Sequence, residues 1–238
     1  MTTDASSKTL LITGASKGLG KVIAEYYLDK GWSVFGCARS ESQIEHDNYQ
    51  HFQLDITSPE QVATLFKDIR KYTKHLNALI NNAGIASMNA FALTPSHTFE
   101  KVFATNVHGT FLFCQKALGM LKRANSSCII NMTTVAVPLQ LEGEAVYAAS
   151  KSAVETLTQI IAKEYGVFNI RCNAIGPSPI QTNLIRSVPK DKIDKLIDHQ
   201  AIKEMATPED VTNLVDFFLS PASKMITGQI IYLGGISK

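Results

Sequence analysis

The sequence predicts an α/β fold in which a doubly wound, parallel sheet of about seven strands carries helices on both faces. Short β-rich runs alternate along the chain with longer helical patterns, which is the order of elements in such a fold. The β-rich runs are almost continuously apolar, as strands covered on both faces must be. The segments between them are long enough for the crossover helices that parallel strands require.

The predicted strands are short runs rich in β-branched and other apolar residues. Each is followed by a segment of different pattern, so each run has a natural end. In chain order, the strand candidates are Thr9–Thr13, Ser33–Cys37, His51–Leu54, Ala78–Asn81, Cys128–Met132, Ile170–Ala174 and Ile230–Leu233.

The predicted helices fill the segments between these strands. Gly31 ends the first helix, and Pro59 and Pro208 occupy first-turn positions directly after Ser58 and Thr207, which are suitable N-cap residues. The helix candidates are Gly18–Lys30, Pro59–Tyr72, Thr98–Arg123, Val146–Tyr165 and Pro208–Leu219.

The 238 residues, 45% of them hydrophobic and 18% charged, provide one sizeable core without a repeat or a linker. We therefore expect a single domain over residues 1–238. The longest irregular connection runs from Pro177 to Thr207 and contains a short amphipathic segment at 191–197. Because long connections after strand ends are often functional, we expect a substrate lid over about 178–207.

The composition argues against several other kinds of protein. A formal net charge of +2 without a basic run disfavours a nucleic-acid binder. The polar N-terminal segment is neither a signal peptide nor a membrane anchor, so we expect no membrane contact and a cytoplasmic location. The six histidines are dispersed and predict no metal site, and the four cysteines predict buried free thiols: Cys37, Cys114, Cys128 and Cys172.

A glycine-rich loop joins the first predicted strand to the first predicted helix. Gly14, Gly18 and Gly20 follow a Gly-x-x-x-Gly-x-Gly spacing. Such glycines let the backbone approach a pyrophosphate, while the helix N-terminus offers free N–H groups. The loop therefore predicts a dinucleotide site in a Rossmann-type fold, although a purely structural turn is the alternative.

The end of the second predicted strand indicates which dinucleotide is bound. Ala38, Arg39 and Ser40 stand about where such folds contact the adenosine ribose. No carboxylate is present there to accept from a 2′-hydroxyl, whereas the Arg39 guanidinium suits a phosphate and Lys17 adds a second cation. These residues favour NADP(H) over NAD(H), unless Arg39 is a solvated loop residue.

Tyr147 and Lys151 lie one helical turn apart in Tyr-x-x-x-Lys. Residues at i and i+4 share one helix face, so the ammonium can lie near the phenol and favour its ionised form. Such a pair predicts a proton donor and the group that tunes it, with Thr134 as a third, hydroxyl-bearing member. By itself, such a pair more often marks a partly exposed helix face, so the rest of the chain must decide between the two interpretations.

Several ordered motifs together resemble the short-chain dehydrogenase/reductase family in its single-domain form. They are Thr13-Gly14-x-x-x-Gly18-x-Gly20, Asn81-Asn82-Ala83-Gly84, Asn106 and Tyr147-x-x-x-Lys151, and the resemblance covers essentially the whole chain. It implies that Tyr147 is the general acid in reduction, that Lys151 also holds the nicotinamide ribose, and that Asn106 anchors a water. The implied cofactor contacts are Gly14, Ser16, Lys17, Gly18, Leu19, Gly20, Arg39, Ser40, Asp55, Ile56, Asn82, Ala83, Gly84, Tyr147, Lys151, Pro177, Ile180 and Thr182.

Three positions depart from the family pattern. Thr134 stands where the family has its catalytic serine; it keeps the hydroxyl but adds a methyl that narrows the pocket, and Thr133 is the fallback hydroxyl. Ser178 follows Pro177 where a glycine is usual, and would be strained if that turn needs a positive φ. Glu204 stands where relatives acting on acyl-carrier substrates often have an arginine.

The size and motif style are most similar to 3-oxoacyl-[acyl-carrier-protein] reductases, which implies reduction of a 3-oxoacyl thioester by NADPH. An acidic carrier protein could dock at Lys122 and Arg123, although the second basic position of such reductases is Phe168 here, and the pair could simply favour a helix C-terminus. The predicted pocket wall is apolar: Val135, Val137, Pro138, Leu139, Leu141, Gly143, Ile180, Leu184 and Ile185.

Two alternatives to that substrate remain open. One is a general ketone, steroid or polyol dehydrogenase with the same machinery. The other is a weakly catalytic, reductase-like subunit that serves in binding or assembly. The resemblance also implies a homodimer or homotetramer formed through the helices Thr98–Arg123 and Val146–Tyr165.

Overall fold

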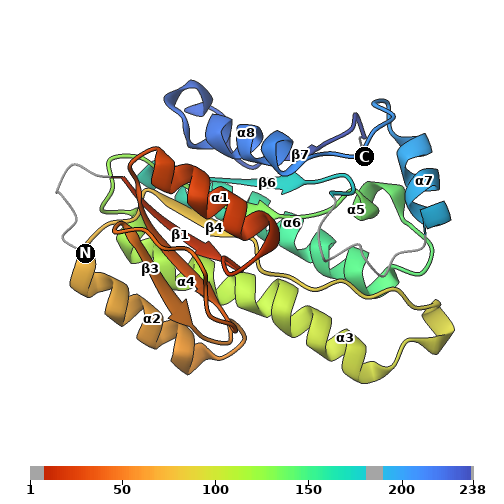
Figure 1. Cartoon of the computed structure of the whole chain (residues 1–238), viewed down its shortest axis with the longest axis horizontal. Helices are drawn as coiled ribbons and strands as arrows, with labels where there is room; N and C mark the ends of the chain where they lie inside the picture. Colours follow the sequence, from red (N-terminus) through yellow and green to blue (C-terminus); the bar gives the residue numbers. More distant parts are fainter. Residues whose placement is uncertain (1–7, 181–189, 237–238) are drawn as a thin grey trace.

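The computed structural model describes residues 8–180 and 190–236 and shows one seven-stranded sheet in which every pair of neighbours is parallel. The strand order is β3-β2-β1-β4-β5-β6-β7, so the chain winds outward in both directions from β1 and β4 (Figure 1). The predicted fold class is confirmed. The strands are β1 (Thr9–Thr13), β2 (Ser33–Ala38), β3 (Tyr49–Gln53), β4 (Ala78–Asn81), β5 (Ser127–Met132), β6 (Ile170–Gly176) and β7 (Ile230–Tyr232).

All seven predicted strands are present; β1 and β4 have the predicted bounds, and the bounds of the other five differ by one or two residues. The largest shift is in β3, which begins at Tyr49 and not at His51, because Tyr49 and Gln50 pair with Val34 and Phe35 of β2. At the other edge, β6 continues to Gly176 because Ile175 and Gly176 pair with β7.

The five predicted helices are present in the predicted order, one of them divided, and two further helices, α5 and α7, lie between them. The predicted helix Thr98–Arg123 is divided into α3 (Ser96–Phe103), a π-helical turn (Ala104–His108) and α4 (Gly109–Leu121). Ser58 and Thr207 act as N-caps as predicted, since each side chain accepts a backbone N–H from the first turn. The other helices are α1 (Gly18–Asp29), α2 (Pro59–Tyr72), α5 (Ala136–Leu139), α6 (Ala145–Tyr165), α7 (Lys190–His199) and α8 (Pro208–Leu219), with 3₁₀ turns at Phe91–Leu93, Gly166–Phe168 and Pro221–Ser223.

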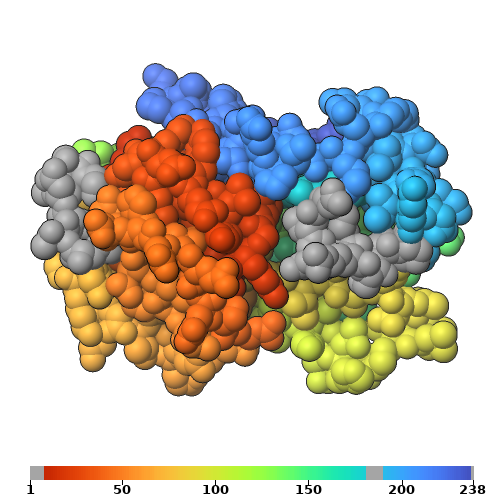
Figure 2. Space-filling view, in the orientation of Figure 1, coloured from red at the N-terminus to blue at the C-terminus, as the bar shows by residue number. Residues whose placement is uncertain are grey.

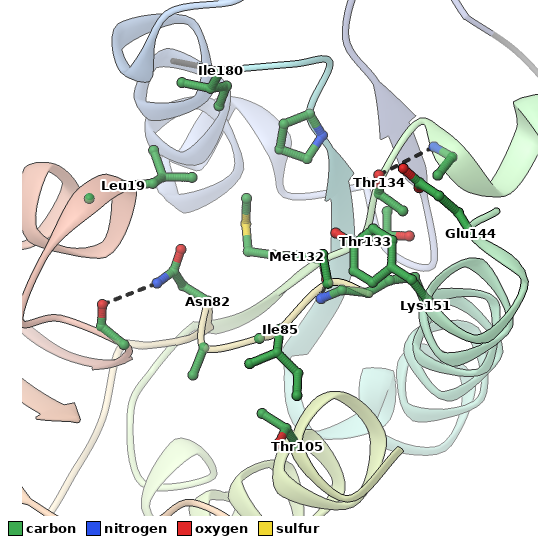
Figure 3. Close-up of a pocket in the computed structure, with 18 of the residues that line it drawn as sticks. Leu19, Asn82, Ile85, Thr105, Met132, Thr133, Thr134, Glu144, Lys151 and Ile180 are labelled. Carbon is green, nitrogen blue, oxygen red and sulfur yellow. Dashed lines mark hydrogen bonds between the residues drawn. The ribbon is translucent and has the colours of Figure 1, made fainter. Parts of the chain in front are cut away.

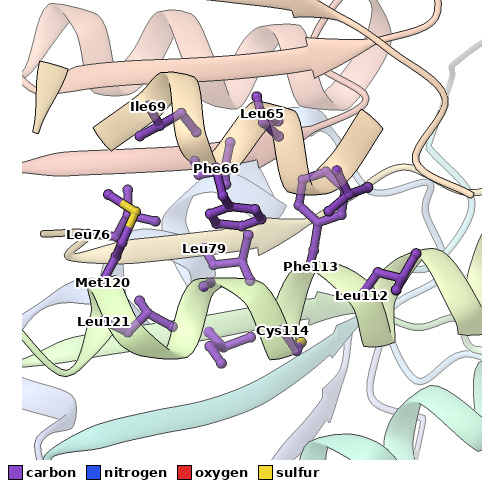
Figure 4. Packing of buried hydrophobic residues seen from close by; sticks show 14 of the residues in the cluster. Leu65, Phe66, Ile69, Leu76, Leu79, Leu112, Phe113, Cys114, Met120 and Leu121 are labelled. Atoms are coloured by element: carbon purple, nitrogen blue, oxygen red, sulfur yellow. The ribbon is translucent and has the colours of Figure 1, made fainter. Parts of the chain in front are cut away.

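Two apolar clusters cover the two faces of the sheet. On one face, Phe66 of α2 and Phe113 of α4 pack edge to face with ring centroids 5.8 Å apart, above Leu79 of β4 (Figure 4). On the other face, α1 and α8 pack through side chains such as Tyr27 and Phe218. Because both faces are buried, the strands carry apolar residues at nearly every position, and the four cysteines are buried free thiols as predicted.

The carboxyl ends of the central strands all lead into the loops that form the functional site. The loop after β1 enters α1, the loop after β4 precedes α3, the loop after β5 contains α5, and the segment after β6 leads toward α7 (Figure 1). In open parallel sheets, ligands bind at this edge, where neighbouring strands send their loops in opposite directions.

Candidate active site

A cavity of about 1090 Å³ opens at the carboxyl edge of the sheet. Its lining begins at the glycine loop after β1, continues past the loop after β4 and ends among α5, α6 and α7. In the space-filling view, the red N-terminal part of the chain packs directly against the blue C-terminal part (Figure 2). The cavity therefore extends from the glycine loop to α6 and α7, and different kinds of residue line these two ends.

The glycine loop brings backbone close to the cavity at its first end. Gly14 adopts φ +72°, and a Cβ at that position would lie only 2.8 Å from Nδ2 of Asn82. Thr13 fixes the neighbouring loop, because its Oγ1 accepts hydrogen bonds from the backbone N–H groups of Asn82 at 3.1 Å and Ala83 at 2.9 Å. At Gly18, φ is +58° and no atom lies within 4 Å of a Cβ position, so space for a ligand remains in front of α1.

The end of β2 places cations beside the same part of the cavity. Arg39 and Lys17 are exposed and both line the cavity, and Ser40 Oγ donates to Ser16 Oγ at 3.0 Å. Asp55 also lines this end; its carboxylate accepts from the backbone N–H and hydroxyl of Thr57, and these bonds together with Arg39 lower its pKa. The charges suit a ligand that carries phosphate groups.

At the other end of the cavity, three predicted side chains converge. Tyr147 projects from α6. Lys151 projects from the same helix, and Thr134 follows the end of β5 (Figure 3). Their exposed fractions are 8%, 5% and 9%, so all three are buried in the protein and face the cavity. Lys151 Nζ donates to the backbone carbonyl of Met132 at 2.7 Å, which fixes the ammonium at the cavity wall.

Two titratable side chains at this end of the cavity, Tyr147 and Lys151, have perturbed pKa values. Burial raises the pKa of Tyr147 to about 12, while a hydrogen bond with Thr134 opposes the rise and Glu144 adds to it. Burial also lowers the pKa of Lys151 to about 8. Lys151 does not contribute to the shift in the pKa of Tyr147, so the prediction that Lys151 favours ionisation of the phenol stays a prediction.

The two threonines at the end of β5 point in different directions, as strand alternation requires. Thr133 Oγ1 donates to the buried carboxylate of Glu155 at 2.6 Å, and Tyr232 of β7 donates to the same carboxylate oxygen at 2.7 Å. Thr134 instead hydrogen-bonds Tyr147, and its Oγ1 accepts from the backbone N–H of Ala136 at 3.2 Å. Thr134 is thus the hydroxyl in the site, and the fallback Thr133 is occupied elsewhere.

Asn106 lies in the π-helical turn and is completely buried. Its side chain accepts from the backbone N–H of Ile85 and donates to the carbonyl of Ile85, both at 2.9 Å, and also donates to Ser150 Oγ at 3.0 Å. Asn106 therefore ties the loop after β4 to α6 beside Lys151. The predicted role in holding a water stays a prediction.

The backbone after β6 shows whether Ser178, which stands where a glycine is usual, adopts a strained positive φ. Among the described residues, the only non-glycine residues with positive φ are Gln140 and Asn169, so Ser178 carries no such strain. Pro177, Ser178 and Ile180 line the cavity as predicted, as do Leu19, Ile56 and Gly84. Thr182, Leu184 and Ile185 lie outside the described residues.

The predicted apolar wall is only partly correct. Val135, Leu139, Leu141 and Ile180 do line the cavity, but so do polar and charged residues of the loop after β5 and of α7. Asp191, Lys192, Lys195 and His199 belong to the segment predicted as a lid, whereas Gln140, Glu142 and Glu144 were not predicted at the cavity. Glu144 had a usable signal, since it stands three residues before Tyr147 and therefore shares its helix face.

Lys122 and Arg123 do not lie at the mouth of the cavity. They follow α4 and precede β5, so they lie at the amino edge of the sheet, opposite the edge where the cavity opens (Figure 1). Lys122 Nζ lies 3.6 Å from the centre of the Phe168 ring, in a cation–π contact. Docking of an acidic carrier protein at this pair stays a prediction without support from the geometry of one chain.

Comparison with known proteins shows the same architecture across the whole chain. Residues 14–236 match a family model described as enoyl-(acyl carrier protein) reductase. An L-xylulose reductase of Caenorhabditis elegans is 32% identical over 98% of this chain and 96% of its own length. The chain belongs to the short-chain dehydrogenase/reductase family.

Other members of this family differ in what they act on. A 3-oxoacyl-[acyl-carrier-protein] reductase of Staphylococcus epidermidis is 28% identical over 96% of this chain and 98% of its own length. A crystal structure of a short-chain dehydrogenase from Leptospira borgpetersenii with bound NAD+ is 25% identical and superposes with a TM-score of 0.87, covering 96% of this chain and 92% of the other.

Membership in the short-chain dehydrogenase/reductase family makes this protein an oxidoreductase of alcohol and carbonyl groups that binds a nicotinamide cofactor. Over the described ranges 8–180 and 190–236, no helix is long and apolar enough to cross a membrane. In the same ranges, no group of three or more histidine, cysteine or acidic side chains is arranged to hold a metal ion.

Replacing Glu144 by Gln is expected to move the pH profile of alcohol oxidation to lower pH. Glu144 raises the pKa of Tyr147, so removing its charge lowers that pKa, and the phenolate that accepts the proton forms at lower pH. The pH dependence of kcat/KM for oxidation measures the shift. A profile that does not move would show that the carboxylate does not act on Tyr147.

Proposed function

We propose that this member of the family reduces a ketone to an alcohol with NADPH. The observation that carries the proposal is the convergence of Thr134, Tyr147 and Lys151 at one end of a cavity that has the glycine loop and Arg39 at its other end. The length of the cavity lets one dinucleotide reach from the cations to the proton-donating groups. At both ends the residue types suit this reaction, since cations can bind the phosphates of the cofactor and hydroxyl groups can bind the carbonyl of the substrate.

The protein's part in the reaction is to hold the carbonyl and deliver a proton. The bound cofactor supplies the hydride. The hydroxyls of Tyr147 and Thr134 donate hydrogen bonds to the carbonyl oxygen, where negative charge develops, and Tyr147 transfers its proton to that oxygen. The Lys151 ammonium, held by the Met132 carbonyl, stabilises the phenolate that remains. Burial of all three side chains strengthens these interactions.

The choice of NADPH over NADH rests on the end of β2. Arg39 and Lys17 line the cavity where the adenosine ribose is expected, and the strand carries no carboxylate between Ser33 and Ala38. A guanidinium binds a 2′-phosphate through two hydrogen bonds, whereas a 2′-hydroxyl gives it no comparable partner. The charges therefore support NADP(H) as the physiological cofactor.

Replacing Arg39 by Asp is expected to reverse the cofactor preference. The carboxylate repels a 2′-phosphate and can accept a hydrogen bond from a 2′-hydroxyl, so the ratio of kcat/KM for NADPH to that for NADH should fall by about tenfold or more. Arg123→Asp, a change of an exposed arginine far from the cavity, is the matched control. An unchanged ratio in Arg39→Asp would refute the phosphate role.

Two classes of substrate remain candidates. A 3-oxoacyl thioester on an acyl-carrier protein is supported by the similarity to the Staphylococcus reductase and by the apolar residues Leu139, Leu141 and Ile180. A hydroxylated ketone is supported by the similarity to the L-xylulose reductase and by the charged residues at the same end of the cavity. NADPH oxidation with acetoacetyl thioesters, ketoses and simple ketones tests both, and a complete lack of turnover would refute the proposed reaction.

We also propose that the protein forms a homodimer or homotetramer through α3, α4 and α6. Phe99, Phe111 and Ile160 are 47%, 41% and 46% exposed on these helices. A shallow hollow between them is lined by Phe103, Val107 and Leu157, among others. A second copy would remove this apolar surface from water, and light scattering that reports a monomer would contradict the proposal.

A further inference from the structure

Glu144 brings a carboxylate to the substrate end of the cavity. It is the N-cap residue of α6, one turn before Tyr147, and its side chain extends into the region of Thr134 (Figure 3). The residue is half-buried, and burial raises the pKa of its carboxyl group. The charge is close enough to raise the pKa of Tyr147 as well.

The carboxylate has no protein partner among the residues that the structure describes. Its side chain makes no capping hydrogen bond to α6 and no ion pair within 4 Å. A half-buried carboxylate without hydrogen bonds is costly, and this one also opposes the ionisation of Tyr147. Helix capping does not account for its place, and its position in the lining of the cavity makes it available to bind a substrate.

Lys192 of α7 provides an opposite charge across the same space. It lines the cavity and lowers the pKa of Glu144, although the two side chains do not form an ion pair within 4 Å in the described part of the chain. Its Nζ contacts Met88 Sδ at 3.7 Å, so the ammonium is placed at the rim of the cavity. An acceptor inside the cavity thus faces a donor at its rim.

We infer that Glu144 and Lys192 form a polar subsite that selects ketones carrying a hydroxyl group one or two carbons from the carbonyl. This inference rests on the proposed reduction and favours the second of the two substrate classes. Because Glu144 and Tyr147 are neighbours on one helix face, about 5–6 Å apart at Cβ, a carbonyl held by Tyr147 places its adjacent carbons near the carboxylate.

The chemistry of the subsite distinguishes a hydroxyl from other substituents. A hydroxyl can donate to Glu144 and accept from Lys192, so it satisfies both groups. An anionic group would be repelled by Glu144, and a cationic one by Lys192. An alkyl chain would cover the carboxylate without giving it a hydrogen bond. The buried carboxylate would then be unsatisfied, so the alkyl substrate would bind much more weakly.

The test compares two substrates that differ only by a hydroxyl in place of a methyl group, hydroxyacetone and butanone. For the wild type with NADPH, kcat/KM should be higher for hydroxyacetone by about tenfold or more. Glu144→Leu should remove this preference by lowering the hydroxyacetone value, and Glu144→Gln, which keeps an acceptor, should remove only part of it. Glu164→Gln, an exposed carboxylate at the other end of α6, should leave the ratio unchanged.

The outcomes separate this inference from the proposed function. Equal rates for the two ketones, or a preference that survives Glu144→Leu, would overturn the subsite while the reductase proposal stands. Turnover of acetoacetyl thioesters without turnover of hydroxyacetone would do the same. NADPH binding, followed by its fluorescence, shows that each variant is folded. A protein that binds NADPH and reduces no ketone at all would instead refute the proposed function.

Discussion

Replacing Tyr147 by Phe is expected to lower kcat for ketone reduction by about 10³-fold, within the range of general acid catalysis. The change removes one oxygen from a buried side chain and leaves the ring that packs at the start of α6. The carbonyl then loses its proton donor and one of its two hydrogen bonds. NADPH binding should persist, because the glycine loop and Arg39 lie at the other end of the cavity.

Tyr165→Phe is the matched control for this experiment. Tyr165 is the last residue of the same helix and does not line the cavity. Stopped-flow measurement of NADPH oxidation should therefore separate the two variants clearly. If Tyr147→Phe kept wild-type activity, the proton would have to come from another group. If the wild type and Tyr147→Phe were equally inactive, the result would favour the alternative of a weakly catalytic binding subunit.

Removing the hydroxyl of Thr134 is expected to lower kcat by about 10²-fold or more, the usual effect of losing one donor to a developing oxyanion. Two variants remove the hydroxyl in different ways. Thr134→Val keeps the branched shape beside Ala136, and Thr134→Ala removes the branch as well. Both also remove the hydrogen bond that lowers the pKa of Tyr147, so the loss acts on two groups at once.

Thr134→Ser is the control, because it keeps the hydroxyl and removes only the methyl group. Its turnover should equal or exceed that of the wild type, and bulky ketones should gain most, since the methyl narrows the pocket. Steady-state kinetics with two ketones of different size would measure this. Full activity in both Thr134→Val and Thr134→Ala would move the carbonyl-binding role to another donor.

The sheet could be predicted well from the sequence because buried parallel strands leave a clear apolar pattern. The exceptions have physical causes. Tyr49 and Gln50 belong to β3 only because β2 offers them backbone partners, which the local pattern does not reveal. The π-helical turn at Ala104–His108 interrupts a segment with helical residues throughout, and its buried Asn106 bonds to Ile85 and Ser150, which are distant in sequence.

The candidate site was predictable where the spacing of residues within one local motif fixes how they lie relative to one another. The glycine loop, Arg39, Tyr147 and Lys151 fall at the cavity as the sequence indicates. The predicted lid contains Lys192, but the sequence does not reveal which lid side chains face the cavity, because that depends on how α7 packs. The rise in the pKa of Tyr147 was missed for a similar reason, since the depth of burial is a property of the folded chain.

The hydrogen bonds of Glu155 with Thr133 and Tyr232 connect the end of β5, beside the candidate active site, to the edge strand β7. β7 has three residues, is half-exposed and forms one edge of the sheet in a single chain. Edge strands open locally more easily than central ones, and opening β7 would release Glu155 from Tyr232. Since Glu155 also accepts from Thr133, next to Thr134, we expect the placement of the Thr134 hydroxyl to depend on the stability of the sheet's edge as well as on its centre.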